Sequence, residues 1–249
     1  ANNGVLATGA NKLGIATPHI RRNVKGCWNL GSCGMGCPTN AKQSMLVTTI
    51  PAALMAGARL YHRARVRDLL IQGDQVTGVL VDAMPEKGHQ PTGVTLTVTA
   101  RREVILSAGA FGSPHLLMLS GIGPEDELRQ HGILLRHALE GVGRNLQDHL
   151  DYTILYTSPR PDVVGFNPAG LMRMVRGWTP FKESGTGLLT SPGAEGCAFF
   201  HSRPGLSRPD LQAHFVVAIV DDHMRRRHMA DGWSLHVCPL RPESRGSVG

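Results

Sequence analysis

The sequence predicts a mixed α/β fold, and three features of the 249-residue chain favour it. The first is a continuous apolar run at 104–106 that ends in small residues, as in a parallel strand buried on both faces. The second is the alternation of apolar and polar residues before that run, which is typical of an antiparallel meander. The third is a change near residue 150 to a sequence rich in Pro and Gly, which predicts a second domain.

Two helices are expected before the strands. Residues 1–20 suit a short helix and its exit, and the Gly-rich segment 26–44 follows as a loop. Apolar residues within 45–57 recur near the helical period, and Gly57 is expected to end this second helix. Pro51 marks either a kink in the helix or its true start.

The strands are expected in two groups. Residues 59–83 contain two alternating runs with a turn at 73–75, and residues 94–100 alternate with Val94, Leu96 and Val98 on one face. These three strands form the expected meander. Two further strands are expected at 211–220 and 233–240, beyond the predicted domain boundary near residue 150.

The stretch 107–124, SAGAFGSPHLLMLSGIGP, is consistent with the end of a strand, a tight turn and a helix. Its first four residues have very small side chains, so that a flat or phosphorylated ligand could contact the backbone there: Ser107, Ala108, Gly109 and Ala110. Ser113 suits the N-cap, Pro114 the first helical position and Gly121 the helix end. The amides at such a helix start can bind an anion. From the residues alone, two interpretations are about equally favoured. The stretch is either a ligand-binding site or a strand–helix turn whose only role is packing.

Residues 109–123, GAFGSPHLLMLSGIG, resemble the second signature of the glucose–methanol–choline (GMC) family of flavin oxidoreductases. The resemblance rests on small residues, Ser-Pro, two aliphatic residues and then Ser-Gly-aliphatic-Gly. Residues 140–149, EGVGRNLQDH, are similar to the segment that follows this signature in the family. Residues 33–44, CGMGCPTNAKQS, and 241–249, RPESRGSVG, also resemble family segments, so the resemblance covers nearly the whole chain.

The resemblance implies that the chain is part of an FAD-dependent enzyme that transfers a hydride from an alcohol carbon to the flavin. It implies a doubly wound FAD-binding domain with an antiparallel meander, of which 1–150 are the central and C-terminal part. Residues 151–249 would then be part of a substrate-binding domain with an antiparallel sheet. The backbone of Val66 would pair with the adenine edge, and 107–110 would lie along the ADP moiety. The implied cofactor-binding residues are Val66, Ser107, Ala108, Gly109, Ala110, Ser113 and Asn145.

Some expected parts of such an enzyme have no match in this sequence. No strand followed by Gly-x-Gly-x-x-Gly is found, and none of the 12 histidines matches the family's catalytic motif. We therefore expect the middle of a longer oxidoreductase, with no catalytic residue of its own, weak or no flavin retention and no turnover alone. The resemblance places Asn145 and His149 near the hinge between the two domains. A structural cap at Asn145 is at least as well supported as a contact of Asn145 with the cofactor. The identity of the alcohol, the distinction between oxidase and dehydrogenase, and the oligomeric state stay open.

The net charge of +7 and the pI near 9.5 raise the alternative of a non-catalytic basic α/β module that binds an anionic ligand or nucleic acid. The two basic clusters, at 19–25 and 223–228, lack interleaved aromatic residues, so we expect no nucleic acid as a partner. The ligand that the family resemblance implies is a small-molecule alcohol. No run of about 18 apolar residues suggests a membrane span. No feature identifies a compartment, and the cytoplasm is favoured.

The cysteines could bind a metal ion, form a disulfide or simply pack in the interior. Cys27, Cys33 and Cys37 are six and four residues apart, unlike the Cys-x-x-Cys of common zinc sites, and a fourth ligand would have to come from Cys197, Cys238 or a histidine. Small buried thiols packed near the cofactor are the favoured interpretation.

The segment that contains Asp221, Asp222, His223 and His228 is interpreted as a solvated turn. A Ser/His/Asp hydrolase is disfavoured because no Gly-x-Ser-x-Gly elbow is present.

Overall fold

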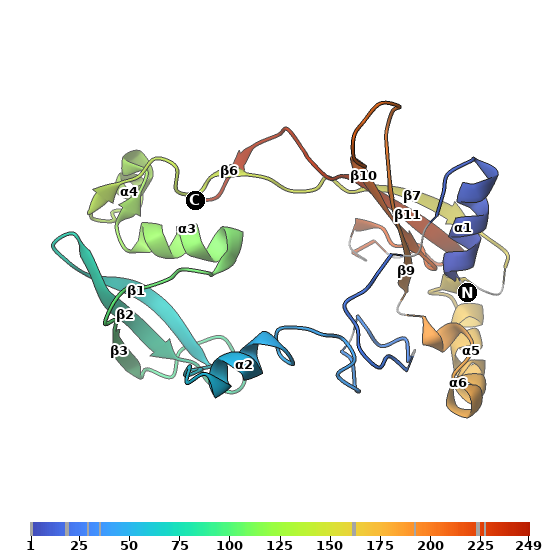
Figure 1. The fold of residues 1–249 in the computed structure, drawn as a ribbon, viewed down its shortest axis with the longest axis horizontal. Coiled ribbons are helices and arrows are strands. Elements are labelled where there is room, and N and C mark those ends of the chain that lie inside the picture. The colour runs from blue at the N-terminus through green and yellow to red at the C-terminus, as the bar shows by residue number, and fades with distance from the viewer. Residues whose placement is uncertain are drawn as a thin grey trace. The chain divides into compact units, whose positions relative to one another are not determined.

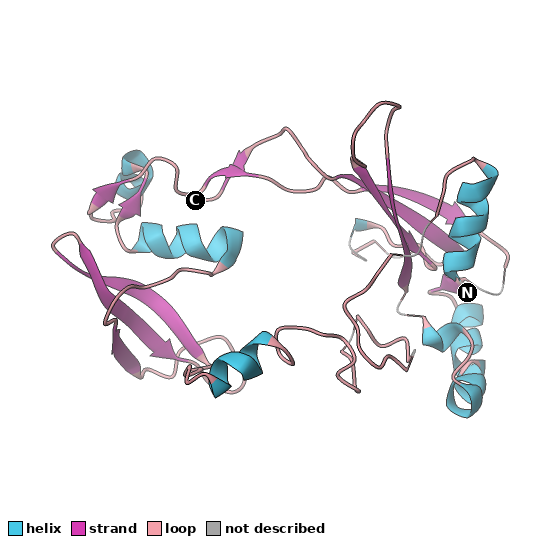
Figure 2. Cartoon of the chain, in the orientation of Figure 1, coloured by secondary structure: helices cyan, strands magenta, loops and turns pink. Residues whose placement is uncertain are grey.

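The computed structural model describes residues 2–17, 20–28, 30–34, 36–160, 163–191, 193–222, 225–226 and 228–249. The chain divides into two compact units (Figure 1). Unit 1 comprises Ala1–Gly57 and His149–Pro242, and unit 2 comprises Ala58–Asp148 and Glu243–Gly249. Both units combine helices with antiparallel strands (Figure 2), which confirms the predicted mixed α/β class.

Unit 2 is built on the predicted meander, which the structure confirms. Strands β1 (Ala64–Gln72), β2 (Gln75–Ala83) and β3 (Thr95–Thr99) form an antiparallel sheet in the order β1-β2-β3. The tight turn between β1 and β2 uses Gly73 at φ +57°, a conformation that favours glycine. The apolar residues predicted to share one face of β3 and its approach are about half exposed: Val94, Leu96 and Val98.

Helix α3 (Gly109–Leu119) packs against β1 and supplies part of a small core. After it come β4 (Ile122–Gly123), α4 (Glu125–Gln130) and β5 (His137–Ala138), with β4 and β5 parallel. The core cluster is formed by Met118, Leu128 and Val142, with Leu117 and Ile133 packed against it. Strand β6 (Arg144–Leu146) pairs with β12 (Gly246–Ser247), which brings the last residues of the chain into unit 2.

Unit 1 contains a larger antiparallel sheet in the order β7-β11-β10-β9, with β8 also paired to β11. Its strands are β7 (Tyr152–Thr157), β8 (Val164–Gly165), β9 (Ala194–Phe200), β10 (Leu211–Val216) and β11 (Asp231–Pro239). Strands β10 and β11 confirm the two predicted strands, whereas β7 and β9 were not predicted. Trp233 of β11 stacks on Tyr156 of β7, with ring centroids 4.3 Å apart, so aromatic contacts reinforce the backbone ladder.

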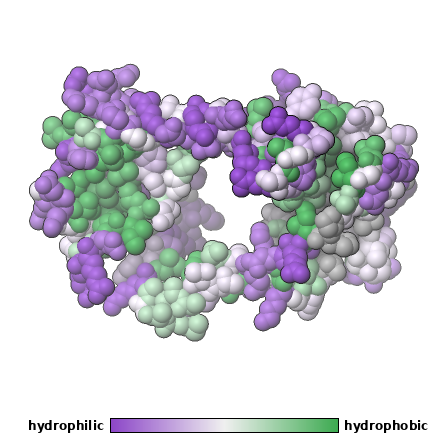
Figure 3. Space-filling model, turned by 45° about the horizontal axis from the view of Figure 1, so that its top comes forward, coloured by the Kyte–Doolittle hydropathy of each residue, from purple (hydrophilic) through white to green (hydrophobic). Residues whose placement is uncertain are grey.

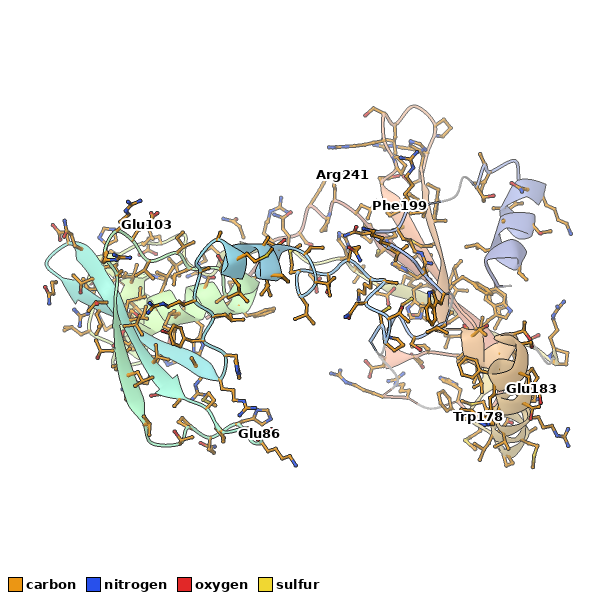
Figure 4. All side chains as sticks on the ribbon, turned by 60° about the horizontal axis from the view of Figure 1, so that its bottom comes forward. Glu86, Glu103, Trp178, Glu183, Phe199 and Arg241 are labelled. Carbon is orange, nitrogen blue, oxygen red and sulfur yellow. The ribbon has the colours of Figure 1, made fainter. Side chains whose placement is uncertain are left out.

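The helices of unit 1 begin and end at recognisable residues. Helices α1 (Asn2–Lys12) and α2 (Thr49–Met55) confirm the two predicted helices, and Pro51 lies in the first turn of α2 rather than at a kink. Helix α5 (Pro168–Arg176) is capped by Asn167, whose side chain accepts a hydrogen bond of 2.7 Å from the amide of Gly170. Helix α6 (Trp178–Ser184) and the 3₁₀ turn η1 (Leu188–Thr190) follow; Figure 4 shows Trp178 and Glu183 on α6.

Two local predictions are wrong. Residues 104–106 form no strand: Val104 and Leu106 are half-buried, and Ile105 is 76% exposed. A strand buried on both faces needs a hydrogen-bonded neighbour, and the described residues supply none at this run. Helix α3 begins at Gly109 rather than at Pro114, which lies inside it.

Among the described residues, no helix has the length and apolar character that crossing a bilayer requires.

Candidate cofactor-binding site

Residues 107–113 of unit 2, which we call the small-residue corner, comprise the last two residues before α3 and the first five residues of that helix. Residues 107–110 are all exposed, and Gly109 has φ +80°, which only glycine adopts without strain. A Cβ atom built on Gly109 would meet no other atom within 4 Å. The corner therefore presents open main chain and the free amides of an 11-residue helix.

Ser113 supports this corner from within the helix. Its Oγ accepts a hydrogen bond of 3.1 Å from the amide of Ala108, so it fixes the residue just before the helix. Sequence reasoning placed Ser113 at the N-cap, with the helix beginning after it. The side chain instead bonds an amide on its N-terminal side, and residues 109–112 of the helix precede Ser113.

The far end of α3 is fixed to the sheet by Ser120, which is 2% exposed. Its hydroxyl donates to the carbonyl of Leu116 at 2.8 Å and accepts from the amide of Leu69 in β1 at 3.0 Å. Gly121, at φ +81°, then turns the chain so closely that a Cβ atom would overlap the carbonyl of Leu134. These contacts hold α3, and with it the corner, against β1.

Val66 lies on β1, the strand against which α3 packs, and is 38% exposed. Its neighbours Arg65 and Arg67 both reach the buried carboxylate of Asp82 in β2, at 4.0 and 3.3 Å. Because side chains alternate along a strand, Val66 points to the opposite face. A register shift follows directly after Val66, so the ladder is irregular there. The ion pairs thus fix the backbone of β1 on both sides of Val66.

Asn145 lies in β6 and adopts φ +59°. It is exposed, and the register of β6 against β12 shifts around it. Asparagine tolerates the left-handed conformation better than most residues, which gives Asn145 a backbone role.

His149 begins the second segment of unit 1, and its Nδ1 lies 4.0 Å from Sγ of Cys238. Among the described residues, a hydrogen bond joins Ala108 to Ser113, and none links either of them to Asn145 or Val66.

Apolar side chains surround the corner in the sequence and are exposed. Ile105 precedes it and Phe111 lies within it, with 76% and 67% of their surfaces exposed. Figure 3 shows a broad hydrophobic area on unit 2. Exposed apolar surface next to open backbone is typical of a surface that a ligand or another protein segment covers.

Sequence reasoning missed a hydrogen-bond network in unit 1. Nδ1 of His236 lies 2.7 Å from a carboxylate oxygen of Asp151, and its Nε2 lies 3.2 Å from Oγ of Ser234. The order of groups is that of a hydrolase triad. Ser234, however, is fully buried and donates its hydroxyl hydrogen to the carbonyl of Ala218 at 3.0 Å, so it cannot act as a nucleophile. The signal was present, because residues 234 and 236 share one face of a strand.

The cysteines and the acidic cluster also differ from expectation. Cys27, Cys33 and Cys37 are half-buried rather than buried; all five cysteines are described, and no disulfide joins them. In the described part of the chain, no group of three or more His, Cys, Asp or Glu residues could hold a metal ion.

Asp221 is not simply solvated, since its carboxylate lies 2.9 Å from Nε2 of His228 and this hydrogen bond lowers the pKa of Asp221. His223 lies outside the described residues.

Comparison with known proteins gives a consistent result. The sequence pattern of the family described as GMC oxidoreductase matches residues 1–151. An alcohol dehydrogenase [acceptor] of Pseudomonas putida is 44% identical over 147 residues, which are 59% of this chain and 27% of that protein. An oxygen-dependent choline dehydrogenase of Photobacterium profundum is 38% identical over 184 residues, which are 73% of this chain and 30% of that protein.

The solved structures agree. A pyridoxine 4-oxidase from Mesorbium loti superposes with a TM-score of 0.54 at 29% identity, over 74% of this chain and 30% of that one. A formate oxidase gives a TM-score of 0.56 at 25% identity, over 73% of this chain and 35% of that one. The chain thus spans about a third or less of the length of these proteins.

Proposed function

Because this chain belongs to the GMC oxidoreductase family, we propose that it forms part of an FAD-dependent enzyme that oxidises the CH–OH group of a small-molecule alcohol. The observation that carries the proposal is the small-residue corner, with its open main chain at the start of α3. The corner lies inside the residues that match the family.

The corner suits the phosphate-bearing part of FAD in charge and in shape. The first amides of α3 point outward from the positive end of the helix dipole, which favours an anion. Residues 107–110 are exposed and carry small side chains, so a pyrophosphate could approach the backbone. In the proposed role Ser107, Ala108, Gly109 and Ala110 lie along the ADP moiety. Ser113 holds the amide of Ala108 and keeps its own hydroxyl proton available as a donor.

Val66 and Asn145 complete the proposed set of cofactor-binding residues. A strand backbone offers an amide and a carbonyl that can pair with the edge of an adenine, and Val66 lies on β1, an edge strand of its sheet. The ion pairs of Arg65 and Arg67 with Asp82 would keep that backbone in place. Asn145 presents an exposed amide side chain on a left-handed turn. We propose that it contacts the cofactor from the β6–β12 ribbon.

FAD, when bound, supplies the hydride acceptor, and the residues of this chain bind and orient it. We assign no catalytic base to this chain. We further propose that 1–150 belong to the FAD-binding domain and 151–249 to the substrate-binding domain. The antiparallel sheet β7-β11-β10-β9 would then form one wall of the substrate site. The relatives named for alcohol, choline and pyridoxine support an alcohol as the substrate class.

The proposal is tested on the whole protein that contains this segment. We expect the purified protein to carry a flavin absorbance band that bleaches when a suitable primary or secondary alcohol is added without oxygen. A folded, colourless protein that does not bind added FAD would overturn the proposal. A mobility-shift titration at low salt distinguishes the basic-module alternative, and we expect no shifted DNA or RNA.

A further inference from the structure

The segment 26–44, which we call the cysteine segment, surrounds a small, partly open cavity in unit 1 with a volume of about 20 Å³. Three of the five cysteines of the chain line this cavity, although they are spread over eleven positions of sequence. The described residues that line it are Cys27, Trp28, Leu30, Gly31, Ser32, Cys33, Cys37, Pro38, Thr39 and Ala41. Among them, the cysteines are the only residues with ionisable side chains.

The two ends of the cysteine segment are held together by backbone hydrogen bonds. The amide of Lys25 donates to the carbonyl of Ala41 at 2.8 Å, and Val24 and Lys42 form an antiparallel bridge. Ala41 is only 3% exposed. Within the segment, the amide of Gly36 donates to the carbonyl of Ser32 at 3.0 Å. The loop is therefore closed at its base and folded back on itself.

The loop is also packed tightly against the rest of unit 1. Gly31 has φ +70°, and a Cβ atom there would overlap the carbonyl oxygen of Thr190 in η1. Only a glycine can lie so close to that backbone. This contact fixes the middle of the segment and leaves the thiols around the same cavity.

Cys37 differs chemically from an ordinary thiol. Its Sγ lies 3.5 Å from Oγ1 of Thr39, and this side-chain contact is the main reason that its pKa is lowered to about 7. Backbone hydrogen bonds from Lys42, Thr39 and Ala41 act in the same direction. Near neutral pH about half of the Cys37 side chains are thereby thiolate, which is the nucleophilic form of cysteine. Cys37 is only half-buried and so remains accessible to a small reagent.

We propose that the cysteine segment is a redox-sensitive thiol site, in which Cys37 reacts with a hydroperoxide and a second cysteine of the cavity then forms a disulfide with it. In the first step the Cys37 thiolate attacks the peroxide, the O–O bond breaks, and sulfenic acid and hydroxide (for an organic hydroperoxide, alkoxide) are formed. In the second step the thiol of Cys33 or Cys27 attacks the sulfenic sulfur, the S–S bond forms and water leaves. The thiols are oxidised by two electrons and the peroxide is reduced by two.

The site does not depend on the proposed flavin function, because all its groups lie in 26–44. A metal site is the less suitable interpretation, since no described group of three His, Cys, Asp or Glu residues could hold an ion. Thiols that share a cavity near a nucleophilic thiolate are suited to oxidation and resolution instead.

The first experiment measures alkylation of each cysteine against pH, by mass spectrometry of peptides from the chain treated with iodoacetamide. We expect the rate at Cys37 to reach half its maximum near pH 7. Thr39→Val should lower that rate at pH 7 about fivefold, because loss of the hydroxyl raises the pKa of Cys37 toward that of an ordinary thiol. Thr39→Ser should restore it. Buried Cys238, whose pKa burial raises, reports in every sample that unit 1 is folded. An unchanged rate in Thr39→Val would overturn the assignment.

The second experiment adds hydrogen peroxide in small excess and identifies disulfides and dimedone-trapped sulfenic acid by mass spectrometry. We expect a disulfide between Cys37 and either Cys33 or Cys27. The serine variant of that partner should instead accumulate the trapped sulfenic acid at Cys37. Cys197→Ser is the control, since Cys197 does not line the cavity, and should behave like the unchanged chain. Oxidation of Cys37 no faster than Cys197, or a disulfide that leaves Cys37 out, would contradict the proposal.

Discussion

The small-residue corner and the cysteine segment are both rich in small residues, yet they present opposite chemistry. At the corner, residues 107–110 are exposed and the space beside Gly109 is open, so the main chain itself is available to a ligand. In the cysteine segment, Gly31 is pressed against Thr190, and side chains close a cavity. A glycine can therefore mark a close contact within the protein, as at Gly31, or open backbone, as at Gly109, and only the neighbouring atoms distinguish the two cases.

The largest stability effect is expected from Gly31→Ala compared with Gly109→Ala. Both glycines have positive φ, so the backbone strain is similar. Only at Gly31 would the methyl group overlap another backbone atom. We expect Gly31→Ala to cost about 1–3 kcal/mol more than Gly109→Ala in urea unfolding. Gly26→Ala, at φ +64° with open space, is a second control and should resemble Gly109→Ala. Equal losses at Gly31 and Gly109 would break the comparison.

Next in size is Ser120→Ala, which tests whether α3 is fixed to the sheet beneath the corner. The substitution leaves the buried amide of Leu69 without its partner, at a cost of about 1–3 kcal/mol. Hydrogen exchange should show faster exchange at Leu69, while amides of the separate unit 1 sheet keep their protection. Unchanged exchange at Leu69 would mean that Ser120 does not hold α3 against β1.

A smaller effect is expected from Ser113→Ala, since Ser113 holds the amide of Ala108 at a partly exposed position. Loss of the hydrogen bond to the amide of Ala108 should cost about 0.5–1 kcal/mol. Ser113→Thr keeps a hydroxyl and is the matched control. Faster exchange of the Ala108 amide in the alanine variant alone is the predicted result, and equal exchange in both variants would mean that Ser113 does not hold this amide.

The smallest effect lies outside both loops, at Asp221. The hydrogen bond from His228 lowers the pKa of this carboxyl in the folded chain. A lowered folded pKa stabilises the protein above the unfolded value, and this contribution is lost as pH falls through the folded pKa. Asp221→Asn should therefore be slightly less stable than the parent at pH 6–7, and the difference should begin to shrink below about pH 4 and disappear below the folded pKa of Asp221. Asp74→Asn, in the exposed β1–β2 turn, is the control. A difference that is constant with pH would contradict the assignment.

The sequence was most informative where local pattern and pairing agree. Residues 64–83 alternate, and the turn at 73–75 fixes how the two strands meet, so both strands were predictable. The run at 104–106 has the composition of a buried strand, but composition does not specify a partner strand, and the described residues provide none. Strand β9 contains a glycine and lies in a Pro- and Gly-rich region, which obscured it.

The same limit applies to the sites. The small-residue corner could be predicted because side-chain size can be read from the sequence itself. The start of α3 could not be placed, because Ser113 bonds an amide five residues before it rather than one after it. The polarisation of Cys37 depends on Thr39 and on backbone amides that a turn brings together. The spacing of cysteines carries no information about such amides.

The central claim is that the main chain at the corner binds FAD, and flavin content tests it most directly. In the whole protein, Gly109→Val fills the open space beside the corner, whereas Gly88→Val places the same side chain on a glycine with similar positive φ and open space in another loop. We predict that Gly88→Val retains the flavin-to-protein ratio of the unchanged protein and that Gly109→Val loses most of its flavin. Equal flavin content in the two variants would contradict the account.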